Sequence, residues 1–256
     1  MLKKYLKILL WGLIFYIVLI LIWYAFYYLG TQIFNWWRPY AFPEPIGVAK
    51  KFLSMCQDGK LFPAILASLT RCLTGYFISV IIGILFGLLI TKWKFAERYL
   101  KPLLMGIQSL PSVCWVPFAI LWFGLKNDGI IFVVVMGSVF GIALSVESSI
   151  RNCNPIYEKA ARTMGYKGFY LFFHITIPAS IPEFVSGLRQ GWSFAWRALM
   201  SGEVMTATTG LGYSLMMGRN LADINQVMLI MLVIVLVGIL IDRLIFSTLE
   251  KIVRYY

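Results

Sequence analysis

The stretch EKAARTMGYKGFYLFFHITIP, Glu158–Pro178, interrupts a chain that is otherwise dominated by apolar runs. It follows one such run at residues 129–149 and precedes another at 178–204. As a helix, each run is long enough to cross a hydrocarbon layer of about 30 Å, which needs roughly 20 residues. The stretch therefore connects two predicted membrane spans and is too polar to be one itself.

The first part of this connection predicts a short helix from Pro155 to Met164. Asn154 is a suitable N-cap, proline is favoured at the first helical position, and Gly165 is a typical stop. Such a helix is too short and too charged to cross a bilayer. Its small alanine side chains suit close docking by another protein.

The composition is that of an all-α integral membrane protein. The 256 residues are 60% hydrophobic and 13% charged, and the mean hydropathy is +0.80. β-barrel alternation is absent, so we expect six transmembrane helices, near residues 8–29, 64–91, 102–124, 129–149, 178–204 and 226–246. The first run is longer than a signal-peptide apolar region and lacks a cleavage site after it, so it is expected to be retained.

No internal repeat divides the chain, so residues 1–256 are expected to form a single transmembrane domain. Its parts are an additional N-terminal helix at 1–30, core helices at 64–246 and a cytoplasmic helix region at 155–168. Between the first two spans, Ile46–Met55 predicts an amphipathic helix on the outer surface. The glycines and polar residues of 206–225 predict an ordered loop, with a partly re-entrant segment as the alternative.

Basic residues indicate how the spans are oriented. With these spans, the two ends and the even-numbered connections carry fourteen lysines and arginines, and the opposite side carries six. The positive-inside rule therefore predicts that both termini face the cytoplasm. The formal net charge of +12 is explained by topology, so nucleic acid is not expected as a partner.

Metal and redox sites are not expected. The four cysteines, Cys56, Cys72, Cys114 and Cys153, show no metal-ligand spacing, and His174 is the only histidine.

The fifth span has two unlike faces. With Arg189 as origin and about 100° per residue, one face within about 40° of it carries the polar and bulky residues Ser193, Trp196, Met200 and Glu203, with Trp192 and Arg197 at its margins. The opposite face collects the small residues Gly187, Gly191, Ala195, Ala198 and Gly202. Because ionisable groups at membrane depth usually face protein or water, the first face is a candidate lining for a solute pathway.

Arg71, in the second span, is a further deep cation. With Arg189 and Arg197 it favours an anionic solute. The alternative is that neighbouring groups neutralise these cations for structural reasons, through a backbone carbonyl, Glu147 or Glu203. Both interpretations stay open at this point.

Small-xxx-small pairs predict close helix packing in three spans: Gly83 with Gly87, Gly137 with Gly141 and Gly187 with Gly191.

The opening stretch also resembles a known family. Lys159-Ala160-Ala161, Gly165, Ile175 and Ile177-Pro178 have the spacing of the EAA signature of permease subunits in ATP-binding-cassette (ABC) importers. Two positions depart from it, because Lys159 replaces the signature glutamate and Ile177 its leucine. FPEP (42–45), SLTR (68–71), PLLMGIQSLPSVCWVPFAILWFG (102–124), GLRQGWSFAW (187–196), GLGY (210–213) and GILID (238–242) are similar to the nitrate, taurine and aliphatic sulfonate branch.

This resemblance implies a type I (MetI-like) permease fold in the bacterial cytoplasmic membrane. It also implies a second, usually identical permease chain, two ATPase subunits that bind ATP and magnesium, and an external solute-binding protein. The implied ATPase-coupling residues are Tyr157, Glu158, Lys159, Ala160, Ala161, Arg162, Met164 and Gly165. The candidate pathway residues are Arg71, Arg189, Trp192, Ser193, Trp196, Arg197 and Glu203.

Two other functions compete with an importer subunit. A secondary carrier or channel would use the same charged face but gives no reason for the alanine and glycine spacing after the fourth span. A membrane enzyme is disfavoured because no catalytic carboxylate pair or Cys/His pair is evident. The sequence also lacks a phosphate-binding loop, so ATP hydrolysis is expected in a partner and no cofactor in this chain.

Overall fold

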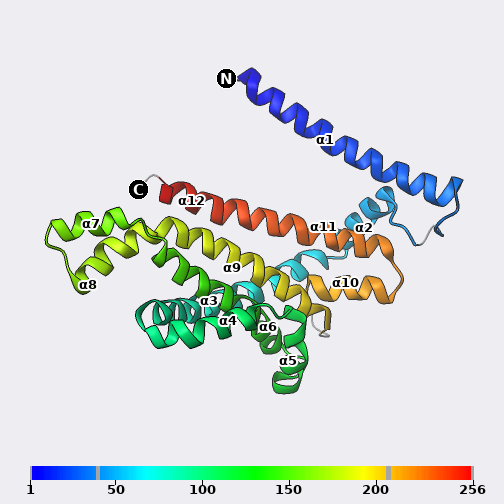
Figure 1. Ribbon diagram of the computed structural model, residues 1–256. Coiled ribbons are helices and arrows are strands. Elements are labelled where there is room, and N and C mark those ends of the chain that lie inside the picture. The colour runs from blue at the N-terminus through cyan, green and yellow to red at the C-terminus, as the bar shows by residue number, and fades with distance from the viewer. Residues whose placement is uncertain (1, 39–40, 206–208, 255–256) are drawn as a thin grey trace. The chain divides into compact units, whose positions relative to one another are not determined.

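The computed structural model describes residues 2–38, 41–205 and 209–254, and for residues 2–9 and 254 only the backbone is described. The regular elements in these ranges are all helices (Figure 1). The all-α prediction is therefore confirmed.

Within the part of the chain that the structure describes, five helices are long and apolar enough to cross a membrane. They are α1 (Leu2–Tyr28), α3 (Leu61–Lys92), α6 (Asn127–Arg151), α9 (Ile177–Met205) and α11 (Ile224–Ile241). The last continues through η5 (Asp242–Phe246) into α12 (Ser247–Arg254). These helices coincide with five of the six predicted spans.

The predicted third span is a bent pair rather than one straight helix. Helical segments Ala96–Gln108 and Ser112–Phe123 meet at 99°, so the described residues hold up to six spans, by length and composition, if this pair counts as one. They comprise η2 (Ala96–Leu100), α4 (Lys101–Gln108), η3 (Ser112–Trp115) and α5 (Val116–Phe123). Pro111 lies at the break with extended backbone, φ −56° and ψ 138°. Proline lacks an N–H group and disrupts a helix, which accounts for the bend.

Short helices occupy the connections. They are η1 (Leu29–Ile33), α2 (Pro45–Gln57), α7 (Pro155–Thr163), α8 (Gly168–Leu171), η4 (Phe172–Thr176) and α10 (Leu211–Asn220). α2 and α7 confirm the two predicted short helices. The loop predicted at 206–225 is wrong over α10, where Leu215, Met216 and Met217 are good helix formers. Residues 206–208 of that prediction lie outside the described residues.

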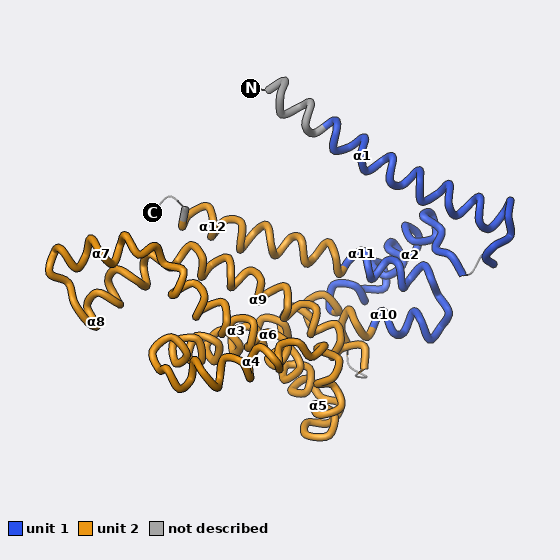
Figure 2. The backbone as a smooth tube through the Cα atoms, viewed as in Figure 1, with its two compact units in different colours: residues 1–63, 214–233 blue, residues 64–213, 234–256 orange. Residues whose placement is uncertain are grey.

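The chain divides into two compact units, residues 1–63 with 214–233, and residues 64–213 with 234–256 (Figure 2). In the first unit, the Trp23 indole donates to the Pro43 carbonyl at 3.1 Å, and the Glu44 N–H donates to the Asn225 side chain at 3.0 Å. Lys51 pairs with Asp223 at 2.7 Å. Burial raises the pKa of Asp223, but hydrogen bonds, above all from Lys51, outweigh it and hold the pKa below its ordinary value.

The second unit is built on close contact of α6 with α3 and with α9. A Cβ atom at Gly87 of α3 would lie 2.5 Å from Val146, and one at Gly137 of α6 would lie 2.4 Å from the Ala198 methyl group. Such distances leave room for hydrogen only, so the backbones approach closely. The close packing predicted from the paired small residues is confirmed, and it fixes which face of α9 is buried.

Candidate functional site

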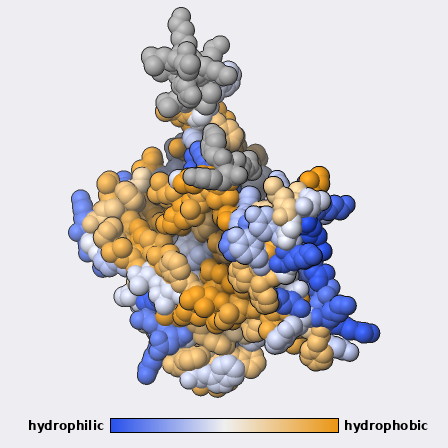
Figure 3. Space-filling view, turned by 90° about the vertical axis from the view of Figure 1, so that its left-hand side faces the viewer, coloured by the Kyte–Doolittle hydropathy of each residue, from blue (hydrophilic) through white to orange (hydrophobic). Residues whose placement is uncertain are grey.

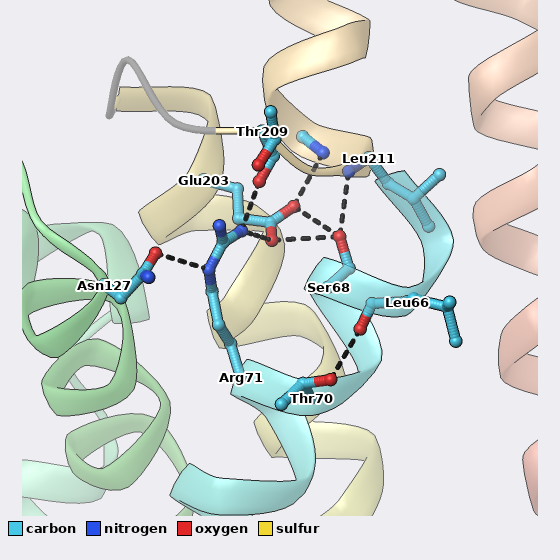
Figure 4. A network of polar contacts seen from close by, with 9 residues as sticks. Leu66, Ser68, Thr70, Arg71, Asn127, Glu203, Thr209 and Leu211 are labelled. Atoms are coloured by element: carbon cyan, nitrogen blue, oxygen red, sulfur yellow. Dashed lines mark hydrogen bonds and ion pairs between the residues drawn. The ribbon is translucent and has the colours of Figure 1, made fainter. Parts of the chain in front are cut away.

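Arg71 and Glu203 meet inside the second unit (Figure 4). Their nitrogen and oxygen atoms are 2.7 Å apart, and Glu203 has no exposed surface. Arg71 also donates to Asn127 at 2.8 Å and to the backbone carbonyl of Thr209. For Arg71 the structure thus favours the alternative of structural pairing. Both charges are enclosed by this chain and lie away from its surface.

The Glu203 carboxylate also organises the start of α10. It accepts hydrogen bonds from the Ser68 hydroxyl at 2.8 and 2.9 Å and from the Gly212 N–H at 2.9 Å. The Leu211 N–H donates in turn to Ser68 at 2.8 Å. A Cβ atom at Gly210 would lie 2.5 Å from the Glu203 carboxylate. The GLGY motif is therefore explained by contact with Glu203: Gly210 admits the carboxylate and Gly212 donates to it.

Arg189 is likewise neutralised within the chain. Its guanidinium donates to Asp242 at 2.6 Å from Nε and makes a second bond from Nη2, and it reaches Glu250 at 3.1 Å. The two nitrogens and two carboxylate oxygens form a bidentate pair, which is the strong geometry for an arginine. This contact ties α9 to η5 and α12. The sequence did not suggest either carboxylate as a partner of Arg189.

Arg197 is the exception among the predicted cations. It is exposed, its Nε donates to the Ser193 carbonyl at 3.2 Å, and its guanidinium lies 5.1 Å from the centre of the Phe194 ring. Among the described residues it meets no carboxylate. It lines a groove of about 360 Å³ together with Ser193, Trp192 and Trp196, in which the two indoles stack at 6.1 Å.

The exposed polar residues of α9 form a stripe of which only Ser193 and Arg197 were predicted as pathway residues from the sequence. This polar stripe consists of Glu183, Ser186, Gln190, Ser193 and Arg197, all exposed. Their spacing of three, four, three and four residues places them on one helix face, rotated by roughly 90° from the predicted face centred on Arg189. The period was visible in the sequence, but only packing shows that the Arg189 side is covered by η5 and α12.

A second groove borders the polar stripe on its other side. It has a volume of about 370 Å³ and brings Gln108 of α4 and Ser145 and Ser148 of α6 beside Ser186 and Gln190. At its end, Asn152 donates to Glu183 at 3.0 Å. α9 therefore presents a continuous polar surface between two grooves, in a helix whose other faces are packed or apolar.

The predicted docking helix is formed as expected and is largely exposed. The Asn154 side chain accepts the Ile156 N–H at 3.0 Å as an N-cap, and Gly165 ends the turn with φ +90°. The two alanines differ, because Ala161 is 3% exposed whereas Ala160 is exposed. The members of the predicted coupling set that lie on the surface are Tyr157, Lys159, Ala160, Arg162, Met164 and Gly165.

Glu158 of the same helix is only partly exposed. It accepts a hydrogen bond from Thr176 at 3.3 Å and lies 4.0 Å from Arg162. This glutamate therefore faces the chain's own next segment, while Lys159, at the place of the signature glutamate, faces outward. The charge offered to a partner at that position is positive.

Known proteins resemble this chain in sequence. The putative aliphatic sulfonates transport permease of Bacillus subtilis is 26% identical over 95% of this chain and 87% of its own length. The nitrate import permease of Synechocystis is 28% identical over 71% and 66% of the two chains. The formylaminopyrimidine transport permease of Halalkalibacterium halodurans is 30% identical over 69% and 70%.

Solved structures resemble it in fold. A chain of an amino acid ABC transporter superposes with a TM-score of 0.66 at 16% identity, and a chain of the MetNI methionine ABC transporter with 0.60 at 19%. Each match covers 78% of this chain and 97% of the other. The predicted permease fold is thereby confirmed. With the family of binding-protein-dependent transport system inner membrane components matching residues 79–254, the chain belongs to that family of ABC importer permeases.

Proposed function

We propose that this permease chain and a second, identical one enclose the pathway of an ABC importer for a small anionic solute. The observation that carries the proposal is the polar stripe of α9. Ionisable side chains in contact with hydrocarbon cost several kcal/mol, so Glu183 and Arg197 need protein or water beside them. A second permease chain packed over the polar stripe would supply protein contacts and enclose water beside these side chains. The two grooves would then form the walls of the solute pathway.

The anionic character of the solute is supported by Arg197. Arg71 and Arg189 are already neutralised by their own carboxylates, so neither offers its charge to a solute. Arg197 keeps its guanidinium available beside Ser193 and the stacked indoles of Trp192 and Trp196. This combination suits an organic anion with an apolar body, and two of the similar permeases carry names for aliphatic sulfonates and nitrate.

Energy would come from two ATPase subunits, which bind ATP and magnesium and dock on α7. The exposed side chains of Tyr157, Lys159, Ala160 and Met164 form the contact surface. An external binding protein would deliver the solute on the opposite side. Because η4 leads directly from this region into α9, movement of α7 can be passed to the polar stripe by a rocking motion.

Both termini would then lie in the cytoplasm of a bacterial cell. The charge distribution supports this orientation. The order of the spans is supported by a contact: the Lys92 ammonium, at the end of α3, lies 4.8 and 5.3 Å from the ring centres of Phe169 and Phe172, at the start of the span that contains α9. The end of one span and the beginning of the other thus share one side of the membrane.

The test is ATP-dependent uptake in proteoliposomes that contain the permease, its ATPase and its binding protein. The solute is first chosen as the anion that raises the melting temperature of the binding protein. Arg197→Gln should lower uptake roughly 10- to 100-fold, which is what the loss of a charged hydrogen bond costs, whereas Arg197→Lys should keep most of it. Arg219→Gln, at an exposed arginine of α10, is the matched control.

Two results would contradict the proposal. Uptake that persists without the ATPase would favour a carrier that works alone. Equal uptake by the Arg197→Gln and Arg219→Gln variants would remove Arg197 from the pathway.

A further inference from the structure

The C-terminal end of α3 carries cations that the transport pathway does not use. Lys92, Lys94 and Arg98 are all exposed, and among the described residues none of them meets a carboxylate. The one acid in this stretch, Glu97, is already paired with Arg151 at 2.6 Å. The end of α3 and the following turn are therefore a surface with a net surplus of positive charge.

Large aromatic side chains surround these cations. Phe95 is 75% exposed and Tyr99 is 58% exposed, and Arg98 lies 6.0 Å from the centre of the Tyr99 ring. Exposed rings and cations that alternate along a few residues are typical of the membrane–water interface, where rings sit at headgroup level.

The segment between α7 and α9 contributes further rings to the same place. The Lys92 ammonium lies 4.8 Å from the centre of the Phe169 ring and 5.6 Å from that of Phe173. Phe169 is 71% exposed and Phe173 is 51% exposed. Lys92 thus joins the end of one span to the beginning of another, and the rings around it stay open on their outer sides.

The length of α3 places this surface at the edge of the bilayer. Its 32 residues extend about 48 Å at 1.5 Å per residue, a little more than the roughly 40–45 Å of a bilayer with its headgroups. A helix of this length that crosses the bilayer reaches the headgroup region at its ends, so we expect Lys92, its last residue, near the lipid phosphates. Figure 3 shows the molecule from the side of α7 and α8, where hydrophobic and hydrophilic patches adjoin.

We propose that this basic–aromatic surface, Lys92, Lys94, Arg98, Phe95, Phe169 and Phe173, binds the headgroup of an anionic phospholipid. The cations would take the phosphate, and the exposed rings would lie among the glycerol and upper acyl groups. Clustered Lys and Arg side chains beside a span attract anionic lipids in this way. The bound lipid would hold the segment that follows α7 at the membrane surface.

The experiment measures lipid preference of the purified permease complex in nanodiscs. Spin-labelled phosphatidylglycerol and phosphatidylcholine report the relative association constant of each lipid for the protein. The triple variant Lys92→Gln/Lys94→Gln/Arg98→Gln should reduce the preference for phosphatidylglycerol by roughly 100-fold, since each cation near an anionic surface contributes roughly fivefold. The control is Lys126→Gln, at an exposed lysine outside this surface.

A second variant distinguishes binding of a lipid headgroup from binding of a free anion at this surface. Phe169→Ala/Phe173→Ala should weaken phosphatidylglycerol binding severalfold, because the rings contact the glycerol and acyl groups that free phosphate lacks. Millimolar inorganic phosphate should not displace phosphatidylglycerol from the parent protein. An unaltered lipid preference in the triple variant, with the complex still assembled, would overturn the proposal. So would displacement of the lipid by millimolar phosphate. Neither result depends on the identity of the transported solute.

Discussion

At the scale of single residues, Glu203 is a buried carboxylate with several polar partners in the second unit. Its carboxylate is fully buried and is held by Arg71, Ser68 and the Gly212 N–H. A buried charge is tolerated only when its partners satisfy it, and the cost of removing one partner falls on the other. The start of α10 therefore depends on Ser68 and Arg71 of α3, which are distant from it in the sequence.

Removing either charge of this pair should destabilise the fold. We expect Glu203→Ala or Arg71→Ala to cost about 3–5 kcal/mol, because the remaining charge is left buried without its partner. The double variant Arg71→Met/Glu203→Leu should recover most of this loss. Thermal unfolding in detergent, followed by size-exclusion chromatography, measures all three. Single variants as stable as the parent protein would contradict the assigned network.

The glycine that donates to Glu203 should not accept a side chain. A Cβ atom at Gly212 would lie 2.6 Å from the Glu203 Cβ and 3.1 Å from the Val204 nitrogen. We expect Gly212→Ala to lower the melting temperature through overpacking of about 1–3 kcal/mol. Gly106→Ala, where no atom lies within 4 Å, is the matched control and should be neutral or slightly stabilising. The same melting temperature for both variants would be evidence against the close contact.

At the scale of helices, α6 is the element on which both α3 and α9 pack. Glycines mark the contacts on each side, with Gly83 of α3 against Ile142 and Gly191 of α9 against the same residue. Since lipid offers no hydrophobic drive for helix association, these contacts depend on close fit. The fit also determines which side of α9 remains free for the polar stripe.

A bulky residue in this contact should separate the helices. Gly137→Leu would drive its side chain into Ala198, because a Cβ atom already lies 2.4 Å from that methyl group. We expect a lower melting temperature and weaker assembly of the complex. Gly12→Leu, on an apolar helix with nothing within 4 Å of the added atom, should change neither. Thermal unfolding measures the melting temperature, and native gels measure assembly of the complex.

Substitutions at the two alanines of α7 should distinguish loss of coupling to the ATPase from loss of folding. Ala160 is exposed, so Ala160→Trp should leave the chain assembled in the membrane but reduce solute-stimulated ATP hydrolysis at least about tenfold. Ala161→Trp should instead destabilise the segment, because that methyl group is buried. Gly165→Trp adds strain at φ +90° of about 1–3 kcal/mol.

The matched control for Ala160→Trp is Ala25→Trp, at an exposed alanine of α1. Full stimulation of ATP hydrolysis in the Ala160→Trp complex would rule out α7 as the ATPase contact. Reduced stimulation in both variants would point to a general effect of the added indole.

At the scale of the whole molecule, the orientation in the membrane determines which partner meets which surface. Two native cysteines can report this orientation: Cys56 is exposed on α2, and Cys153 is partly exposed just before α7. The proposed topology puts these two thiols on opposite sides. Burial raises the pKa of the Cys153 thiol, so it should react more slowly than a free cysteine.

Variants that keep only one of these cysteines can test the orientation. A membrane-impermeant maleimide should label Cys56 in right-side-out vesicles and Cys153 in inside-out vesicles, with Cys153 reacting faster as the pH rises. Labelling of Cys56 and Cys153 from the same side would contradict the proposed topology. Labelling of each thiol from the side opposite to that expected would mean that both termini face outward.

The sequence by itself determined the class of this protein, five of its six predicted spans and the short helices α2 and α7. These depend on hydropathy over about 20 residues and on local caps, such as Asn154 and Gly165, which need no tertiary contact. The EAA-type spacing pointed to the family for the same reason. The identity of the charge partners of Arg189 was not accessible, because Asp242 and Glu250 lie far along the chain.

Only the tertiary structure decided which face of α9 is free. A helical period shows which residues share a face, but whether a neighbour covers that face depends on packing. Close contact with α6 on one side and the pairing of Arg189 with η5 and α12 on another leave the polar stripe of Ser186, Gln190 and Arg197 exposed. Packing likewise decided that Glu203, predicted on the pathway, is buried and paired with Arg71.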